Sequence, residues 1–109
     1  MELILEMQRL RKDLDRSIKE LRRSGMNRAQ TERDYKLLLR TECLKLRAEG
    51  MAIGMIDKIC YGIPSVAEAR FERDVAESVW TANIEAINSI KLQLRLAEQQ
   101  LQREWGNNG

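Results

Sequence analysis

Arginine side chains at helical spacing are the residues of this 109-residue chain best suited to bind a ligand. Between residues 28 and 49 they fall, with Lys36, on a strip between two rows of apolar side chains. Guanidinium groups beside apolar surface need anionic partners, and their planar forks match phosphates and carboxylates. Farther along, arginines alternate with aromatic side chains that could stack on a base. We therefore predict these ligand-binding residues: Arg33, Arg40, Arg47, Tyr61, Arg70, Phe71 and Arg73.

The same arginines also have an ordinary structural interpretation. A carboxylate of the C-terminal segment, such as Glu77 or Glu85, could pair with them, with no ligand involved. A second basic row faces away from the apolar side of the first 24 residues, and three acidic residues flank it. Such a row is usually a solvated surface, although it could also contact a nucleic-acid backbone. Its members are Arg9, Lys12, Arg16, Lys19 and Arg23.

Catalytic and metal-binding motifs are absent from the sequence. The chain contains no histidine, which removes the commonest general base and metal ligand. Cys43 and Cys60 lack the spacing of a metal or redox motif, and we expect both to be reduced and to pack as small apolar residues. The sequence therefore predicts no enzyme activity, no catalytic residue, no bound metal and no cofactor.

The positions of glycine and proline divide the chain into predicted helices. With 33% charged and 5% aromatic residues, the composition is typical of a helical bundle. We predict a single all-α domain over residues 1–109, folded as an antiparallel bundle. Turns at Ser24–Asn27, Gly50 and Gly62–Pro64 would separate its helices, and cap signals lie at Asn27 and Ser65. The predicted helices are 1–24, 28–49, a short one at 51–61 and a long one at about 65–105.

The predicted C-terminal helix carries more apolar surface than a chain of this size can cover. At a rise of about 1.5 Å per residue it would be roughly 60 Å long. The helix over 28–49 would cover little more than half of it, unless the first helix extends the coverage. Its apolar residues recur every eleven positions, which favours straight or faintly right-handed packing. We therefore predict a homo-oligomer whose interface contains Ile90, Leu94, Ala97, Leu101 and Trp105.

Two resemblances connect the sequence with known proteins. The stretch from Leu46 to Val66 resembles a helix-turn-helix, but acidic residues near the start of the second helix, at Glu68 and Glu72, disfavour duplex DNA. Residues 28–105 resemble small helical proteins encoded in early regions of phages and prophages of Gram-positive bacteria. The matching segments are Leu46-Arg47-Ala48-Glu49-Gly50, Ala69-Arg70-Phe71, Arg73-Asp74-Val75-Ala76-Glu77, Glu85-Ala86-Ile87 and Arg103-Glu104-Trp105.

The second resemblance implies a viral protein acting in a bacterial cytosol. The Met1-Glu2-Leu3 start, without a secretory signal, and the lack of a long apolar run favour the same cytoplasmic location. Our leading hypothesis is a non-enzymatic oligomer that counteracts host defence by sequestering an anionic nucleotide signal. The alternatives are an accessory protein of phage replication or recombination that binds single-stranded nucleic acid, and a binder of a host protein.

Overall fold

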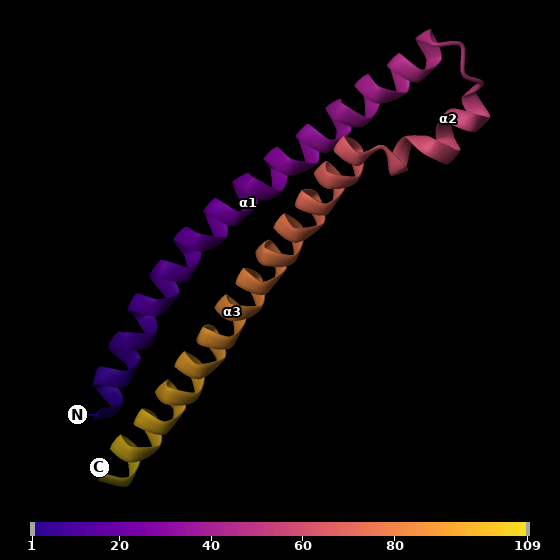
Figure 1. Cartoon of the computed structure of the whole chain (residues 1–109). Helices are drawn as coiled ribbons and strands as arrows, with labels where there is room; N and C mark the ends of the chain where they lie inside the picture. The colour runs from indigo at the N-terminus through magenta and orange to yellow at the C-terminus, as the bar shows by residue number, and fades with distance from the viewer. Residues whose placement is uncertain (1, 109) are drawn as a thin grey trace. The chain divides into compact units, whose positions relative to one another are not determined.

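The computed structural model describes residues 2–108, and within this range every regular element is a helix. The elements are α1 (Glu2–Ala48), α2 (Ile53–Ile59), the one-turn 3₁₀ helix η1 (Cys60–Gly62) and α3 (Pro64–Asn108) (Figure 1). Side chains are described for residues 2–106. The predicted all-α fold is confirmed, and so is the long C-terminal helix, since α3 is unbroken over 45 residues.

The predicted turn at Ser24–Asn27 is wrong. Helices 1–24 and 28–49 are one continuous helix of 47 residues, so they do not lie antiparallel to each other and Asn27 caps no helix. Gly25 lies inside this helix beside the ring of Trp80: a Cβ atom placed there would lie 3.5 Å from Nε1, an ordinary van der Waals distance. Packing of α1 against α3 on both sides of Gly25 outweighs the helix penalty of about 1 kcal/mol that glycine carries.

Gly50, in contrast, does end a helix. Its φ of 93° is a left-handed conformation that side chains disfavour. The N–H of Gly50 donates to the carbonyl of Arg47 at 3.0 Å, and the N–H of Met51 donates to the carbonyl of Leu46 at 3.1 Å. These two bonds form a Schellman motif, which satisfies carbonyls at the end of α1. The predicted short helix at 51–61 is realised as α2 followed by η1.

The two glycines are expected to respond in opposite ways to substitution by alanine. Gly25→Ala should raise the free energy of unfolding by about 0.5 to 1 kcal/mol, because the added methyl group makes ordinary contact with Trp80 and alanine favours the helix. Gly50→Ala should lower it by about 1 kcal/mol, because alanine strains at positive φ. Urea denaturation followed by circular dichroism measures both. If both substitutions change the free energy of unfolding in the same direction, the backbone roles assigned to the two glycines are wrong.

The start of α3 is set by proline. Pro64 supplies a pre-formed helical φ and lacks the N–H that a first-turn residue cannot pair. The N–H of Ala67 donates to the carbonyl of Ile63 at 2.9 Å, which closes the first turn. Because α3 already includes Pro64 and Ser65, the predicted cap at Ser65 is one residue inside the helix rather than before it.

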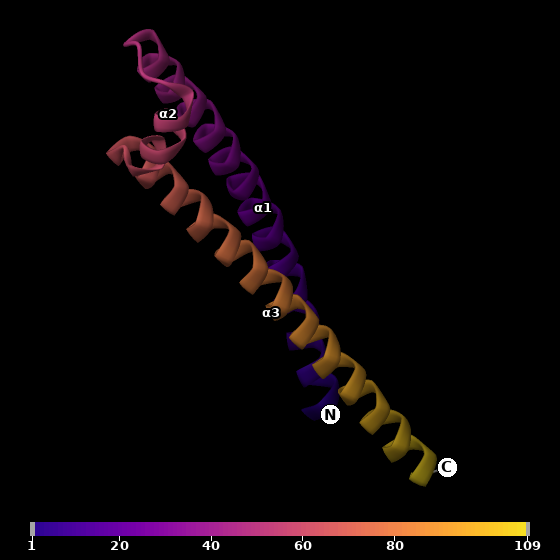
Figure 2. The same ribbon diagram turned by 90° about the vertical axis from the view of Figure 1, so that its right-hand side faces the viewer.

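The chain divides into two compact units, which are described separately. Unit 1 comprises residues 1–23 and 81–109, and unit 2 comprises residues 24–80. In unit 1 the start of α1 and the end of α3 lie at the same end of the unit (Figures 1 and 2). The side-chain amide of Asn83 donates to the backbone carbonyl of Glu20 at 3.5 Å across its two helical segments. The prediction of a single domain stays a prediction.

Unit 2 pairs the second half of α1 with the first part of α3. Gly25 lies against Trp80, Arg28 is paired with Glu77, and Glu32 is paired with Arg73. As the residue number rises along α1 it falls by equal steps along α3, so the two segments are antiparallel. The short elements α2 and η1 complete the unit between the end of α1 and the start of α3 (Figure 2).

The packed faces repeat every seven residues, which corrects the predicted eleven-residue repeat. On α3 of unit 2, the less exposed residues alternate in steps of three and four: Val66, Ala69, Arg73, Ala76 and Trp80. In unit 1 the same alternation continues through Asn83, Ile87, Ile90, Leu94, Ala97 and Leu101. The eleven-residue pattern was wrong because it mixed packed residues with the exposed Val75 and Val79. A seven-residue repeat is typical of coiled-coil packing.

Across residues 2–108, no helix combines the length and apolar character needed to cross a lipid bilayer.

Candidate functional site

Two arginines of unit 2 make reciprocal contacts between α1 and α3. Arg28 on α1 reaches α3, where its guanidinium lies over the ring of Trp80, 4.4 Å from the centroid. One of its nitrogens lies 3.6 Å from Oε1 of Glu77. The ring, the cation and the carboxylate are thus stacked across the helix pair, and each contact of this kind contributes about 0.5 to 1 kcal/mol when exposed.

Arg73 makes the mirror-image set of contacts from α3 to α1. Its guanidinium lies 4.5 Å from the ring centroid of Tyr35, and its Nε lies 3.6 Å from Oε2 of Glu32. It also donates to Oδ1 of Asp74 at 2.8 Å. The hydrogen bond to Asp74, together with the negative charges of Asp74 and Glu32, raises the pKa of Arg73 above its ordinary value. Arg73 is therefore a permanent cation between two acidic groups.

These contacts favour one register of the helix pair. Each helix carries an arginine followed four residues later by a glutamate, Arg28 and Glu32 on α1 and Arg73 and Glu77 on α3, so in the antiparallel pair each arginine meets a glutamate. A shift by one turn would bring like charges opposite each other. Arg28 and Arg73 therefore play a structural role, since each contacts a carboxylate and an aromatic ring of the other helix.

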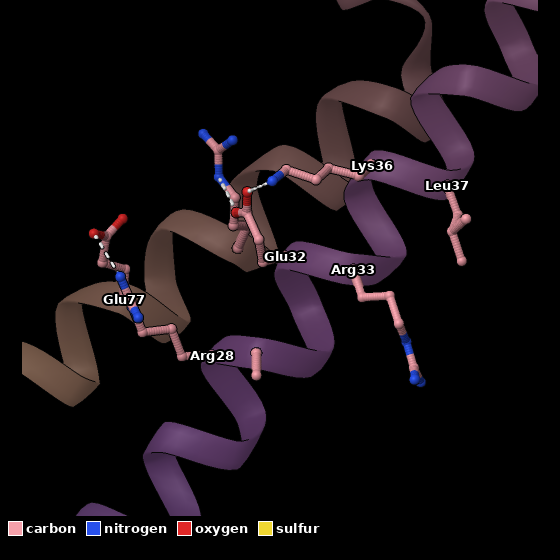
Figure 3. Close-up of a pocket in the computed structure, with 8 residues that line it drawn as sticks. Arg28, Glu32, Arg33, Lys36, Leu37 and Glu77 are labelled. Atoms are coloured by element: carbon pink, nitrogen blue, oxygen red, sulfur yellow. Dashed lines mark ion pairs between the residues drawn. The ribbon is translucent and has the colours of Figure 1, made fainter.

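An open groove of about 720 Å³ lies beside these contacts in unit 2. Figure 3 shows Arg28 directed to Glu77 and Lys36 directed to Glu32, whereas Arg33 and Leu37 point away from α3. Lys36 lies 3.3 Å from Oε1 of Glu32. The groove thus carries a net positive charge, although the carboxylates of Glu32 and Glu77 also line it. Its lining residues are Arg28, Ala29, Glu32, Arg33, Lys36, Leu37, Arg73 and Glu77.

The predicted ligand-binding residues do not converge on one site. Arg33 and Arg73 line the same groove, and Arg70 lies 5.8 Å from the ring centroid of Tyr61. Arg40 and Arg47 are exposed on α1, and Phe71 lines a different groove. Sequence reasoning missed Arg28, whose partnership with Trp80 depends on the helix being continuous through Gly25.

The basic row of unit 1 is partly neutralised by acidic neighbours on the same helix. Arg9 pairs with Glu6, Arg16 lies 3.7 Å from Asp13, and Arg23 lies 3.5 Å from Glu20. Pairs three residues apart on an exposed helix face contribute only about 0.2 to 0.5 kcal/mol each. Their presence reduces the field available to attract a polyanion.

Cys43 and Cys60 face each other in unit 2. Cys60 is buried at 2% exposure, Cys43 is half-buried, and both are free thiols. Desolvation, followed by the hydrogen bond with Cys60 and the charge of Asp57, raises the pKa of Cys43 above the ordinary thiol value. The predicted role as small packed residues agrees with this environment, since a raised pKa leaves little reactive thiolate.

A raised thiol pKa has a consequence for stability at alkaline pH. Below about pH 8.5 the thiol is neutral in both folded and unfolded chains, so its contribution is fully present there. As the pH rises further, the unfolded chain loses this proton more readily, and the folded state is destabilised. Stability should therefore decline from about pH 9 upward, and Cys43→Ala should reduce that decline. Urea denaturation at pH 7, 9 and 10 measures the free energy of unfolding of the wild type and of Cys43→Ala. The same pH dependence of this free energy in both proteins would contradict the prediction.

Four of the five predicted oligomer residues are already packed within unit 1. Ala97 is 7% exposed, and Ile90, Leu94 and Leu101 are half-buried. The remainder of that unit is the first half of α1, which covers them. The first helix thus does extend the coverage of α3, which was the stated alternative to leaving them partly uncovered, and their part in an oligomer interface stays a prediction. Only Trp105, at 68% exposure, stays open.

Other apolar residues of unit 2 are left exposed. On α1, Leu37 is 60% exposed and Leu44 is 57% exposed; on α3, Phe71 is 63% exposed. Val75 and Val79 adjoin Phe71 on α3, and all three line a groove of about 310 Å³ together with Asn27, Thr31, Glu72 and Ala76. Scattered exposed leucines need no explanation, but aligned ones on a helix mark an interaction surface.

Among the described residues, no three acidic or cysteine side chains converge in a way that could hold a metal ion. Comparison with protein-family models, curated proteins and solved structures yields no match.

Proposed function

We propose that this protein is a non-enzymatic helical assembly protein, which forms homo-oligomers by packing the outer faces of unit 2 against another copy. The observation that carries the proposal is the exposure of Leu37, Leu44 and Phe71 after α1 and α3 have formed their own packed face. Burying a leucine or phenylalanine side chain stabilises an assembly by about 1.5 to 3 kcal/mol. The absence of histidine from the sequence supports a non-enzymatic role.

Sedimentation velocity of the full chain between 1 and 200 μM tests this proposal. The sedimenting mass should exceed 12.7 kDa and rise with concentration. The variant Leu37→Gln/Leu44→Gln should stay monomeric while keeping its helical signal, because both side chains are exposed. A wild-type chain that sediments as a monomer throughout would refute the proposed function.

A second candidate, binding of an anionic nucleotide, is supported by the four basic side chains that line the groove of about 720 Å³. The anti-defence role implied by the phage resemblance belongs to this candidate. Calorimetry against linear and cyclic nucleotides should then show heat that is lost in Arg33→Ala/Lys36→Ala. The absence of heat for every nucleotide would eliminate it.

The alternative is that unit 1 binds single-stranded nucleic acid. The dependence of binding on salt concentration distinguishes it from the other candidates. Binding to the basic row would weaken steeply between 50 and 200 mM salt, since it releases condensed counterions. Neutralising Lys12 and Lys19 would weaken it further. If binding is unchanged both by the higher salt concentration and by neutralisation of the two lysines, this alternative is wrong.

A further inference from the structure

Arginine and leucine alternate along the outer face of α1 in unit 2. The residues of this basic face are Arg33, Leu37, Arg40, Leu44 and Arg47, in steps of four and three. All five are exposed, and no acidic residue occurs in the series. The steps of four and three are those of a coiled-coil seam, and Arg33 and Leu37 point away from α3 (Figure 3).

An acidic counterpart lies on α3 of the same unit. The residues of this acidic face are Glu68, Phe71, Glu72, Val75 and Val79, and all five are exposed. The face contains no basic residue, and its apolar members line the groove of about 310 Å³. Two exposed apolar surfaces of opposite charge are therefore present on one chain.

We infer that the occupant of the acidic face is the basic face of a second copy of this chain. The inference rests on the proposed function and specifies its contacts. Charge complementarity favours this pairing over basic-on-basic or acidic-on-acidic contact, because like charges brought together at an interface cost several kcal/mol.

An antiparallel alignment of the two helices satisfies both the charges and the apolar residues. Placing Arg40 opposite Glu72 brings Leu37 opposite Val75, since each lies three residues away in the matching direction. In the same register Leu44 lies opposite Glu68, within one turn of Phe71. Arg47 lies opposite Ser65, and its long side chain reaches towards Glu68 one turn away, so the ion pairs of Arg40 and Arg47 flank the apolar contact of Leu44.

The pairing joins different surfaces of the two copies, so each copy keeps one face free. Such heterologous contacts propagate into rings when the rotation closes and into open chains when it does not. The assembly should therefore contain more than two copies at high concentration. Because the flanking contacts are ionic, raising the salt to 1 M should weaken it about tenfold.

Charge reversal tests the inference with two full-length variants. In Arg40→Glu/Arg47→Glu both faces are acidic, and in Glu68→Arg/Glu72→Arg both are basic. Each variant alone should sediment as a monomer at 100 μM, whereas an equimolar mixture should assemble, because each face again meets its opposite. The control Arg16→Glu/Lys19→Glu reverses two exposed charges of α1 in unit 1 and should assemble like the wild type.

The outcomes separate this inference from the proposed function. If the wild type assembles but either reversed variant also assembles alone, or if their mixture stays monomeric, the pairing is wrong and assembly uses other surfaces. A monomeric wild type overturns both. Circular dichroism verifies that the variants fold, and Leu44→Gln provides a second test without charge reversal: it should weaken assembly at least tenfold, and unchanged assembly would contradict the pairing.

Discussion

Replacing Val66 with aspartate is expected to lower the free energy of unfolding by about 4 kcal/mol. Val66 is fully buried, at 0% exposure, so the substitution removes an apolar contact and buries a carboxylate in its place. The position is in the first turn of α3, where the helix dipole favours an acid by about 0.3 to 1 kcal/mol. That gain is too small to offset the burial.

Val75→Asp is the matched control on the same helix. Val75 is 45% exposed, so the same substitution should change the free energy of unfolding by less than about 1 kcal/mol. It should nevertheless impair assembly, because it replaces the apolar side chain that faces Leu37 of another copy with a charged one. Urea denaturation and sedimentation of both variants give this comparison. Similar stability losses at the two positions would contradict the distinction between packed and outer faces of α3.

Replacing Trp80 with alanine is expected to cost about 3 kcal/mol of unfolding free energy. The ring fills the space beside Gly25 and carries the guanidinium of Arg28. Its loss therefore leaves a cavity between the helices and removes the stacking partner of a cation. The estimate is at the lower end for tryptophan because the side chain is only half-buried.

The other tryptophan provides an internal comparison. Trp105 is 68% exposed, so Trp105→Ala should change the unfolding free energy by about 0.5 kcal/mol or less. In Trp105→Ala the remaining fluorescence reports Trp80 alone, which should respond to unfolding of unit 2. Equal losses for the two alanine variants would show that Trp80 does not anchor the helix pair.

The sequence predicted the helices better than their ends. Periodicity identified the packed face of the first 24 residues, and the run without glycine or proline identified α3. It failed at Gly25, because glycine is a helix breaker locally, whereas packing against a distant segment, with Trp80 beside Gly25, keeps α1 helical through this residue. Only the three-dimensional contact distinguishes this glycine from Gly50, whose positive φ does end a helix.

The candidate surfaces were predicted in part. The spacing of Arg33, Arg40 and Arg47 placed them together on one strip, and the structure leaves all three exposed. These arginines alternate with Leu37 and Leu44, and this alternation indicates an exposed face. The sequence analysis instead placed the arginines on a strip between two packed apolar rows. The coverage of the residues from Ile90 to Leu101 depends on the first half of α1, and the sequence left that coverage open because the apparent turn at Ser24–Asn27 concealed the continuous helix.

Covalent trapping between copies tests the central claim most directly. In a Cys43→Ala/Cys60→Ala background, one copy carries Leu37→Cys and another carries Val75→Cys. Mild oxidation of their mixture should give a disulfide-linked species of twice the 12.7 kDa chain mass, and neither variant alone should give one efficiently. A mixture that stays uncross-linked, or Leu37→Cys copies that link to each other, would contradict the account that the outer face of α1 meets the outer face of α3 of another copy.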